Sequence, residues 1–321
     1  MRTKLMLLPL LLALVASSCW KNEPPASRIS FAVDTTTLAA APVFVAEKKG
    51  FWKDEKLEVD IKPFASGRLA LDALVARAVD SATVADFPVV LAAFQQHRVR
   101  IVGTFSDSDR HVNLLARKDR GISGPQDLKG KRVAFSQGTA SEFVMDMFLQ
   151  QYRLSRTDVK TVALNPPDTV TAIVRGDVDA IFAWQPNIYN AQKQLADKAI
   201  VFPSESIYSQ PFSVVVREDY LNNGEPELIK LLNGLKKATQ FMKQNRAESI
   251  EIVSNKIGVD AKDLALIWDG YSFEVGLDPS LTSAMEKEGD WARNAGIVAK
   301  DAPVPDYKSL VVQKILAHTN D

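Results

Sequence analysis

The chain has 321 residues, 46% of them hydrophobic, and its 39 Lys and Arg are balanced by 39 Asp and Glu. This length allows two domains of ordinary size, and the hydrophobic share is large enough to form full cores without disulfide bonds. The balanced charge excludes the strongly basic surface of a typical nucleic-acid-binding protein, so we expect no nucleic acid among its partners.

The N-terminal segment has the features of a secretion signal. Arg2 and Lys4 precede an apolar run over 5–16, which is shorter than the about 20 residues of a membrane span. Small residues then lead to Cys19, the single cysteine, in a pattern that resembles the lipobox of bacterial lipoproteins. We expect a lipoprotein signal peptide over 1–18, lipidation of Cys19, and a flexible tether over 19–27. The protein would be extracytoplasmic and membrane-anchored, in the periplasm or on the outer face of the cell membrane. An ordinary signal peptide with an incidental cysteine is the alternative.

Short strand-like runs alternate with helical patterns along the body, which is typical of parallel α/β units. The first block predicts strands over 29–33, 57–64, 82–85, 99–105 and 112–117, with helices over 42–49, from 66–67 onward, and over 86–94. The second predicts strands over 132–135, 159–164, 180–184, 199–202 and 212–217, with helices over 140–152, 168–175 and 186–194. From 219 onward the chain is mostly helical, apart from a loop over 270–279.

This organisation predicts two α/β lobes with a ligand cleft between them. The first lobe would contain 28–117 and 214–321, including the C-terminal helices, and the second lobe 118–213. The chain would cross near 115–119 and return near 214–218. Ligands of open α/β sheets bind beyond the carboxyl ends of the strands, so the candidate binding residues follow the predicted strands.

The segment after the strand over 132–135 is the best candidate anion site. Thr139 and Glu142 have the spacing of a capping box, so a helix is expected to start there with its first amides free. Gly138, Thr139, Ala140 and Ser141 would then present amides and hydroxyls to an anion. A plain helix cap that binds nothing is the alternative.

Candidates in the first lobe follow the same logic. Ser66 and Gly67 open a predicted helix, and Arg68 would meet an acidic ligand group or else lie in solvent. Asp86 is predicted to be the N-cap of the helix that contains Phe87, with a ligand contact as a second role. The loop after the first strand adds Thr36, Thr37 and Leu38.

Trp184 and Gln185 end a strand at the predicted edge of the second lobe. An aromatic plate with an amide beside it suits an organic ligand that has apolar and polar parts, although a tryptophan that packs the core is the alternative. The histidines, His97, His111 and His318, are scattered, and no metal-binding or catalytic spacing is present. We therefore expect no catalytic residue, metal or cofactor.

Several segments in order resemble a known family, the extracytoplasmic solute-binding proteins of ABC importers in the nitrate, sulfonate and taurine group, with relatives that bind thiamine-pyrimidine precursors. They cover most of the mature chain: 41–52, 63–67, 86–88, 127–134, 138–140, 176–180 and 184–186. The resemblance implies a two-lobed periplasmic-binding-protein fold of type II. Its loops would capture a small, anionic organic solute (sulfonate, nitrate-like or pyrimidine-type) and deliver it to an ABC permease in the inner membrane. A monomer is expected.

The sequence departs from the family pattern at two places. Many relatives carry glutamate at the position of Gln185, and 35–37 lacks an aromatic residue that some relatives use. Two other functions stay open. One is a ligand-sensing periplasmic subunit of a signalling system. The other is an enzyme on the same fold, although the pyrrole-polymerising and pyrimidine-forming types use body cysteines, which this chain lacks.

Overall fold

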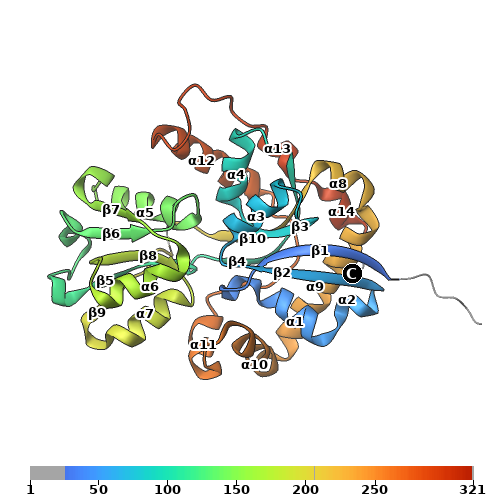
Figure 1. The fold of residues 1–321 in the computed structure, drawn as a ribbon, viewed down its shortest axis with the longest axis horizontal. Helices are drawn as coiled ribbons and strands as arrows, with labels where there is room; N and C mark the ends of the chain where they lie inside the picture. Colours follow the sequence, from blue (N-terminus) through green and yellow to red (C-terminus); the bar gives the residue numbers. More distant parts are fainter. Residues whose placement is uncertain (1–25, 206, 320–321) are drawn as a thin grey trace, which may run out of the picture.

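The computed structural model describes residues 26–205 and 207–319. Its strands form two five-stranded sheets, one in each of two lobes that lie side by side (Figure 1). This confirms the two-lobed α/β fold that the sequence predicted. The predicted signal peptide, Cys19 and nearly all of the tether lie outside the described residues.

The first sheet has the strand order β2-β1-β3-β10-β4. Its strands are β1 (Ser27–Asp34), β2 (Leu57–Phe64), β3 (Ser81–Ala85), β4 (Val99–Ser108) and β10 (Gln210–Arg217). Strand β1 runs parallel to β2 and β3, whereas β10 runs antiparallel to β3 and β4. Every residue of β3 is buried, because helices cover both faces of a central strand in such a sheet.

The second sheet has the order β7-β6-β8-β5-β9. Its strands are β5 (Val112–Arg117), β6 (Arg132–Phe135), β7 (Lys160–Ala163), β8 (Ala180–Trp184) and β9 (Ala199–Phe202). Strand β6 is parallel to β7 and β8, and β5 is antiparallel to β8 and β9. Most predicted strand bounds differ from these by only a few residues.

Both predicted crossing points between the lobes come too late in the chain. The first was predicted at the end of β5, whereas the chain crosses before β5 begins. Strand β5 pairs with β8 and β9 of the second sheet, so the chain crosses at 109–111 and not near 115–119. The return lies between β9 and β10, before β10 joins the first sheet, and not near 214–218. The sequence could not show this, because a fully buried apolar strand has the same pattern in either sheet.

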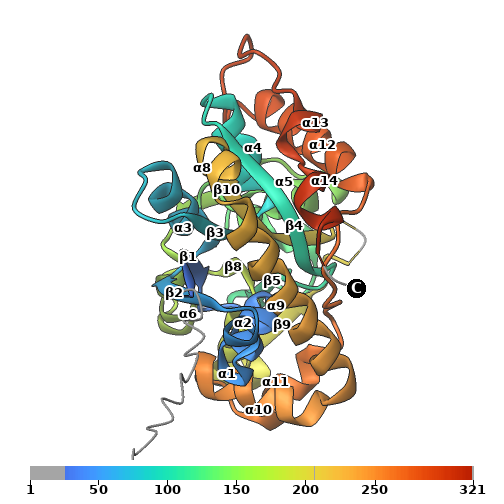
Figure 2. The same cartoon turned by 90° about the vertical axis from the view of Figure 1, so that its right-hand side faces the viewer.

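Helices cover both faces of each sheet, as the two perpendicular views show (Figures 1 and 2). The helices of the first lobe are α1 (Ala41–Lys49), α2 (Phe51–Asp54), α3 (Gly67–Val75), α4 (Asp86–Phe94), α8 (Glu218–Asn223), α9 (Glu225–Gln244), α10 (Arg246–Ile257), α11 (Ala261–Trp268), α12 (Ser280–Asn294), α13 (Tyr307–Leu310) and α14 (Gln313–Ala317). Those of the second are α5 (Ala140–Gln151), α6 (Pro166–Arg175) and α7 (Asn187–Leu195). Within the described ranges, no helix combines the length and apolar character that crossing a membrane requires.

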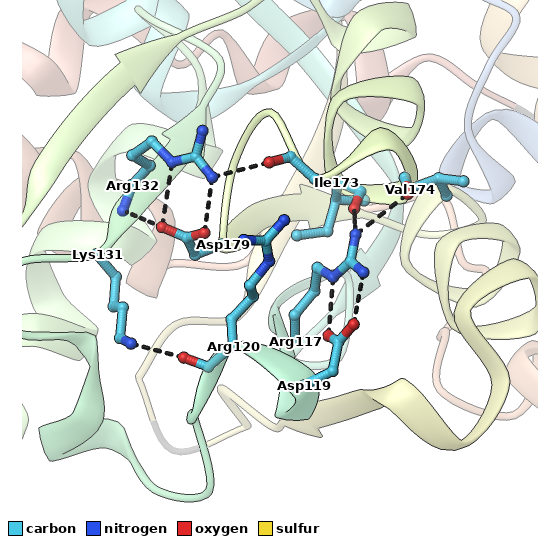
Figure 3. A network of polar contacts seen from close by, with 9 residues as sticks. Arg117, Asp119, Arg120, Lys131, Arg132, Ile173, Val174 and Asp179 are labelled. Carbon is cyan, nitrogen blue, oxygen red and sulfur yellow. Dashed lines mark hydrogen bonds and ion pairs between the residues drawn. The ribbon is translucent and has the colours of Figure 1, made fainter.

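Two arginines hold the C-terminal end of α6 (Figure 3). Arg117 Nη1 donates to the carbonyl oxygens of Ile173 (3.0 Å) and Val174 (3.2 Å), and Arg132 Nη2 donates to that of Gly176 (2.8 Å). These bonds satisfy carbonyls that a helix end leaves without partners, and the positive charges suit the negative end of the helix dipole. The opposite end of α6, at Pro166, lines a cavity together with Arg68 and Leu91 of the first lobe.

An aromatic cluster joins the two lobes. Phe87 of α4 stacks on Phe143 of α5 with ring centroids 6.1 Å apart, and Trp291 of α12 lies 5.1 Å from Phe87 and 5.0 Å from Phe143. Phe87 and Trp291 come from the first lobe but belong to the same apolar core as the helix α5 of the second. Burial of these large side chains favours the arrangement in which the lobes are in contact.

Candidate ligand-binding site

The cleft between the lobes contains two adjoining cavities that share Ser66, Arg68 and Thr139. The inner chamber, of about 30 Å³, is lined by Asp34, Ser66, Gly67, Arg68, Ala85, Pro88, His111, Thr139, Ala140, Trp184, Gln210 and Phe212. The outer chamber, of about 660 Å³, is lined by Ser66, Arg68, Leu69, Asp72, Leu91, Gln95, Ser136, Gln137, Gly138, Thr139, Glu142, Ala163, Leu164, Asn165, Pro166, Asp168, Ile297 and Val298. The carboxyl ends of β1, β3 and β8 all reach the inner chamber, as expected for an open α/β sheet.

Helix α3 brings Ser66, Gly67 and Arg68 to the cleft. Ser66 is the N-cap, and its hydroxyl accepts from the amide of Leu69 (3.2 Å). A Cβ on Gly67 would lie 3.2 Å from the carbonyl oxygen of Thr83, so glycine lets the helix start directly against β3. Arg68 Nε pairs with Asp72 at 3.4 Å, and its guanidinium extends to Gly138 of the second lobe. Arg68 therefore bridges the cleft.

Helix α5 starts on the other side of the same chamber. Thr139 is its N-cap, accepting from the amide of Ser141 (3.2 Å) and donating to the carbonyl of Ser136 (2.8 Å). Glu142 Oε2 accepts from the amide of Gly138 (2.8 Å), one residue before the amide that a capping box uses. The helix start is thus confirmed with a modified cap, and Thr139 and Ala140 line the inner chamber at the positive end of the helix dipole.

Ser141 does not line either chamber. It is fully buried, and its hydroxyl accepts from the amide of Ser136 (3.1 Å) and donates to the carbonyl of Phe182 (2.7 Å). Both bonds hold the turn before α5 against β8. The side chain that was expected to contact a ligand is therefore already used by the fold.

Trp184 lies at the inner chamber, whereas Gln185 does not line it. The Trp184 side chain is 5% exposed and stacks near His111 with ring centroids 6.3 Å apart. Its indole N–H has no hydrogen-bond partner within the described residues, which leaves a buried donor at the cavity. Gln185 Oε1 instead accepts from the amide of Tyr189 (3.2 Å) at the start of α7.

The loop after β1 lies behind the cavity. Thr36 donates from its amide (3.0 Å) and its hydroxyl (2.8 Å) to Asp34 Oδ1. Thr37 is buried and accepts from the amide of Ala39 (3.1 Å), and Leu38 belongs to the apolar core of the first lobe. These three predicted residues line neither chamber, and of the three only Thr36 bonds to Asp34.

Asp86 and Phe87 also lie outside both chambers. Asp86 is the first residue of α4 and not its N-cap, because β3 runs directly into the helix and Ala85 takes the cap position. Asp86 Oδ1 accepts from the amide of Phe87 (3.0 Å) and from the Tyr208 hydroxyl. Burial raises the pKa of Asp86 above its ordinary value, although the bond from Tyr208 lowers it.

Three polar residues of the inner chamber are not among the predicted binding residues. Asp34 ends β1, and burial raises its pKa to about 6, although hydrogen bonds from Thr36 lower it. His111 Nδ1 lies 2.6 Å from the Tyr271 hydroxyl, and burial lowers the pKa of His111 to about 3, so the ring is neutral. Gln210 starts β10, and its Oε1 has no partner within the described residues.

Only Asp34 had a sequence signal, because it directly follows the first predicted strand. His111 and Gln210 lie in or beside the connections between the lobes, whose positions were predicted incorrectly. In the part of the chain that the structure describes, no three His, Cys, Asp or Glu side chains are grouped as a metal site requires. The inner chamber offers hydrogen-bonding groups, the guanidinium of Arg68 and the carboxyl group of Asp34.

A model of the family described as "NMT1/THI5 like" matches residues 38–249, about two thirds of the chain. The chain belongs to the NMT1/THI5-like family. The chain is also similar to the taurine-binding periplasmic protein of Escherichia coli strain K12, with 28% identity over 197 residues, which are 60% of each chain. The resemblance stated from the sequence motifs is thereby confirmed.

Solved structures show the same fold. The alkanesulfonate-binding protein SsuA from Xanthomonas axonopodis pv. citri, bound to MOPS, has a TM-score of 0.80 at 20% identity and covers 91% of this chain and 99% of its own. The periplasmic nitrate-binding protein NrtA from Synechocystis PCC 6803 has a TM-score of 0.72 at 14% identity, with 92% and 89% covered. At these identities the likeness establishes the periplasmic-binding-protein fold for the NMT1/THI5-like chain.

Proposed function

We propose that this protein is the solute-binding component of an ABC importer, which captures a small anionic organic solute between its lobes and presents it to a membrane permease. One observation carries the proposal. The N-termini of α3 and α5, from different lobes, meet at one chamber together with Arg68. Helix N-termini and a guanidinium favour an anion, and their origin in both lobes couples binding to lobe contact.

The relatives support this class of ligand and a function outside the cytoplasm. Those compared above are named for binding taurine, alkanesulfonates or nitrate, each of which carries or is an oxyanion. The neutral His111 and the lack of any nucleophile–base pair among the residues lining the chambers favour binding over catalysis. The leader and Cys19 support a lipid-anchored protein.

Titration calorimetry with a panel of ethanesulfonate, taurine and nitrate tests the proposal, together with mass spectrometry of any solute that co-purifies. The variant Arg68→Gln should weaken binding of the solute about tenfold to hundredfold, because a hydrogen bond to a charged group contributes about 1.5–3 kcal/mol. Arg98→Gln is the matched control, since Arg98 is 79% exposed and pairs with Glu218 away from both chambers. Equal affinity of the wild type and Arg68→Gln would contradict the proposed site.

A further inference from the structure

His111 links the inner chamber to the interior of the first lobe. It lies in the connection at 109–111, lines the chamber and is 4% exposed. Its Nδ1 lies 2.6 Å from the hydroxyl oxygen of Tyr271, which lines neither chamber and belongs to the apolar core of the first lobe. The contact therefore joins a residue of the chamber to one behind it.

Tyr271 is held in place by its neighbours in the loop after α11. Its ring stacks on that of Phe273, with centroids 5.8 Å apart and 5° between the ring planes. Ser272, between them, exchanges two backbone hydrogen bonds of 2.9 Å with Asp107 of β4. These contacts fix the position of the Tyr271 hydroxyl without using any residue of the chamber.

The hydroxyl of Tyr271 decides which ring nitrogen of His111 carries the proton. Burial raises the pKa of Tyr271 well above its ordinary value, so the hydroxyl keeps its proton. Burial lowers the pKa of His111 to about 3, so its neutral ring carries a single N–H. Among the described residues, His111 Nδ1 is the one hydrogen-bond partner of the Tyr271 hydroxyl.

Only one of the two neutral forms of His111 satisfies both groups. If Nδ1 carried the proton and donated it to Tyr271, the buried hydroxyl proton would be left without an acceptor. If the hydroxyl donates to Nδ1 instead, the ring proton lies on Nε2 and both groups are paired. The contact therefore selects the Nε2–H form.

The second ring nitrogen is then a donor at the chamber. His111 Nε2 forms no hydrogen bond within the described part of the chain, and the inner chamber lies beside the ring. Trp184 lines the same chamber, with its ring plane 14° from that of His111 and its own indole N–H without a partner in that part of the chain. The two rings thus bring two uncharged N–H donors to one chamber.

The opposite form of His111 would reverse this contact. With the proton on Nδ1, Nε2 would present a lone pair, which repels the oxygen of an anion instead of bonding to it. The Tyr271 hydroxyl therefore sets whether the imidazole attracts or repels an oxyanion beside Arg68.

We propose that Tyr271 is a positioning residue for solute binding, whose hydroxyl keeps neutral His111 in the Nε2–H form. His111 and Trp184 then donate two uncharged hydrogen bonds to the oxyanion of the solute, in addition to the charged bond from Arg68. This inference rests on the proposed function and adds His111 and Tyr271 to its binding machinery.

NMR of the protein with isotope-labelled histidine side chains measures the protonation of each ring nitrogen. The chain has three histidines, and the variant His111→Gln assigns the signals of His111. In the wild type, Nε2 of His111 should carry the proton and Nδ1 should not, and added ethanesulfonate should shift the Nε2 signal. In Tyr271→Phe, which removes only the hydroxyl, the Nδ1–H form should appear.

Titration calorimetry with ethanesulfonate and nitrate measures the consequence for binding. Tyr271→Phe should weaken binding about twofold to tenfold, the range for loss of one uncharged hydrogen bond. Tyr307→Phe is the matched control and should bind as the wild type does, because Tyr307 is a buried tyrosine of the first lobe that lines neither chamber.

Two substitutions of His111 show whether Tyr271 acts through it. His111→Leu has no ring nitrogen, so Tyr271→Phe should cost no further affinity in that background. The amide nitrogen of glutamine can take the place of Nε2, so His111→Gln should bind more tightly than His111→Leu.

The outcomes separate this inference from the proposed function. A wild type with the proton on Nδ1, or an Nε2–H form that persists fully in Tyr271→Phe, overturns the inference and leaves the binding function intact. An equal loss for Tyr271→Phe in the His111→Leu background also overturns it, since Tyr271 would then act through the fold and not through His111. Failure of the wild type to bind ethanesulfonate, taurine and nitrate alike overturns the proposed function together with the solute contact of His111.

Discussion

The guanidinium of Arg68 in the first lobe packs on the backbone of Gly138 in the second. A Cβ added to Gly138 would lie 1.9 Å from Arg68 Nη1, far inside any permitted contact distance. The absence of a side chain at Gly138 is therefore what lets Arg68 cross the cleft. This contact relates the turn before α5 to the position of Arg68, the one cationic group that the described residues bring to the two chambers.

The variant Gly138→Ala should displace Arg68 and weaken binding of the anionic solute at least about tenfold, the loss of one charged hydrogen bond. Titration calorimetry measures this. Gly138 has φ of 70°, so alanine there also carries a left-handed strain of about 1–2 kcal/mol. Gly121→Ala is the matched control, since Gly121 has φ of 73° in the same lobe and its added Cβ would meet only Lys131 Nζ at 3.9 Å. Equal affinity in both variants would contradict the role of Gly138.

Ser141→Ala should destabilise the protein without contacting the solute. The change removes both bonds of the buried hydroxyl, to Ser136 and to Phe182, and costs about 1–3 kcal/mol for the groups left unpaired. Chemical denaturation of the solute-free protein measures this, with Ser283→Ala on the surface of α12 as a control. A variant that bound the solute more weakly but unfolded at the same denaturant concentration would show that the hydroxyl contacts the ligand.

Glu288→Gln should make the protein more stable at neutral pH. Glu288 is 1% exposed beside Asp86 and Tyr208, and burial and then the charge of Asp86 raise its pKa well above its ordinary value. A raised carboxyl pKa gives stability that is fully present below the unfolded value of about 4.3 and lost as the pH rises through the folded value. Glutamine carries no charge at any pH, so this loss should disappear.

The measurement is the free energy of unfolding from about pH 4 to about pH 8. The wild type should lose stability over this range, and Glu288→Gln should lose clearly less. Glu286→Gln is the matched control, because Glu286 lies on the same helix but is exposed. Parallel pH profiles for the wild type and Glu288→Gln would contradict the assignment of the buried carboxyl.

Cys19→Ala should abolish lipidation and release the protein from membranes. The prediction depends on the leader and on the small residues before Cys19. Membrane fractionation and incorporation of a labelled fatty acid measure it. A Cys19→Ala protein that still carried the label and still sedimented with membranes would refute the anchor.

The sequence by itself determined the local structure of this protein. The alternation of β-type runs with helical patterns predicted both lobes, and Ser66 and Thr139 marked two of the helix starts that reach the cleft. Glycine at the end of a helix was equally informative, because Gly50 and Gly176 have positive φ, which glycine adopts without strain. These features depend on residues near one another in the chain, so a local pattern is sufficient to show them.

Only the tertiary structure decided which sheet each strand joins and which polar groups reach the cavity. Strand β5 has the same apolar pattern in either lobe, and its pairing with β8 moved the crossing and brought His111 to the chamber. Ser141 and Gln185 are polar residues of the kind that often contact ligands, but in this fold their side chains form hydrogen bonds with backbone groups instead. Arg68 and Gly138 meet from positions far apart in the chain. Long-range packing sets these relationships, and no local pattern encodes it.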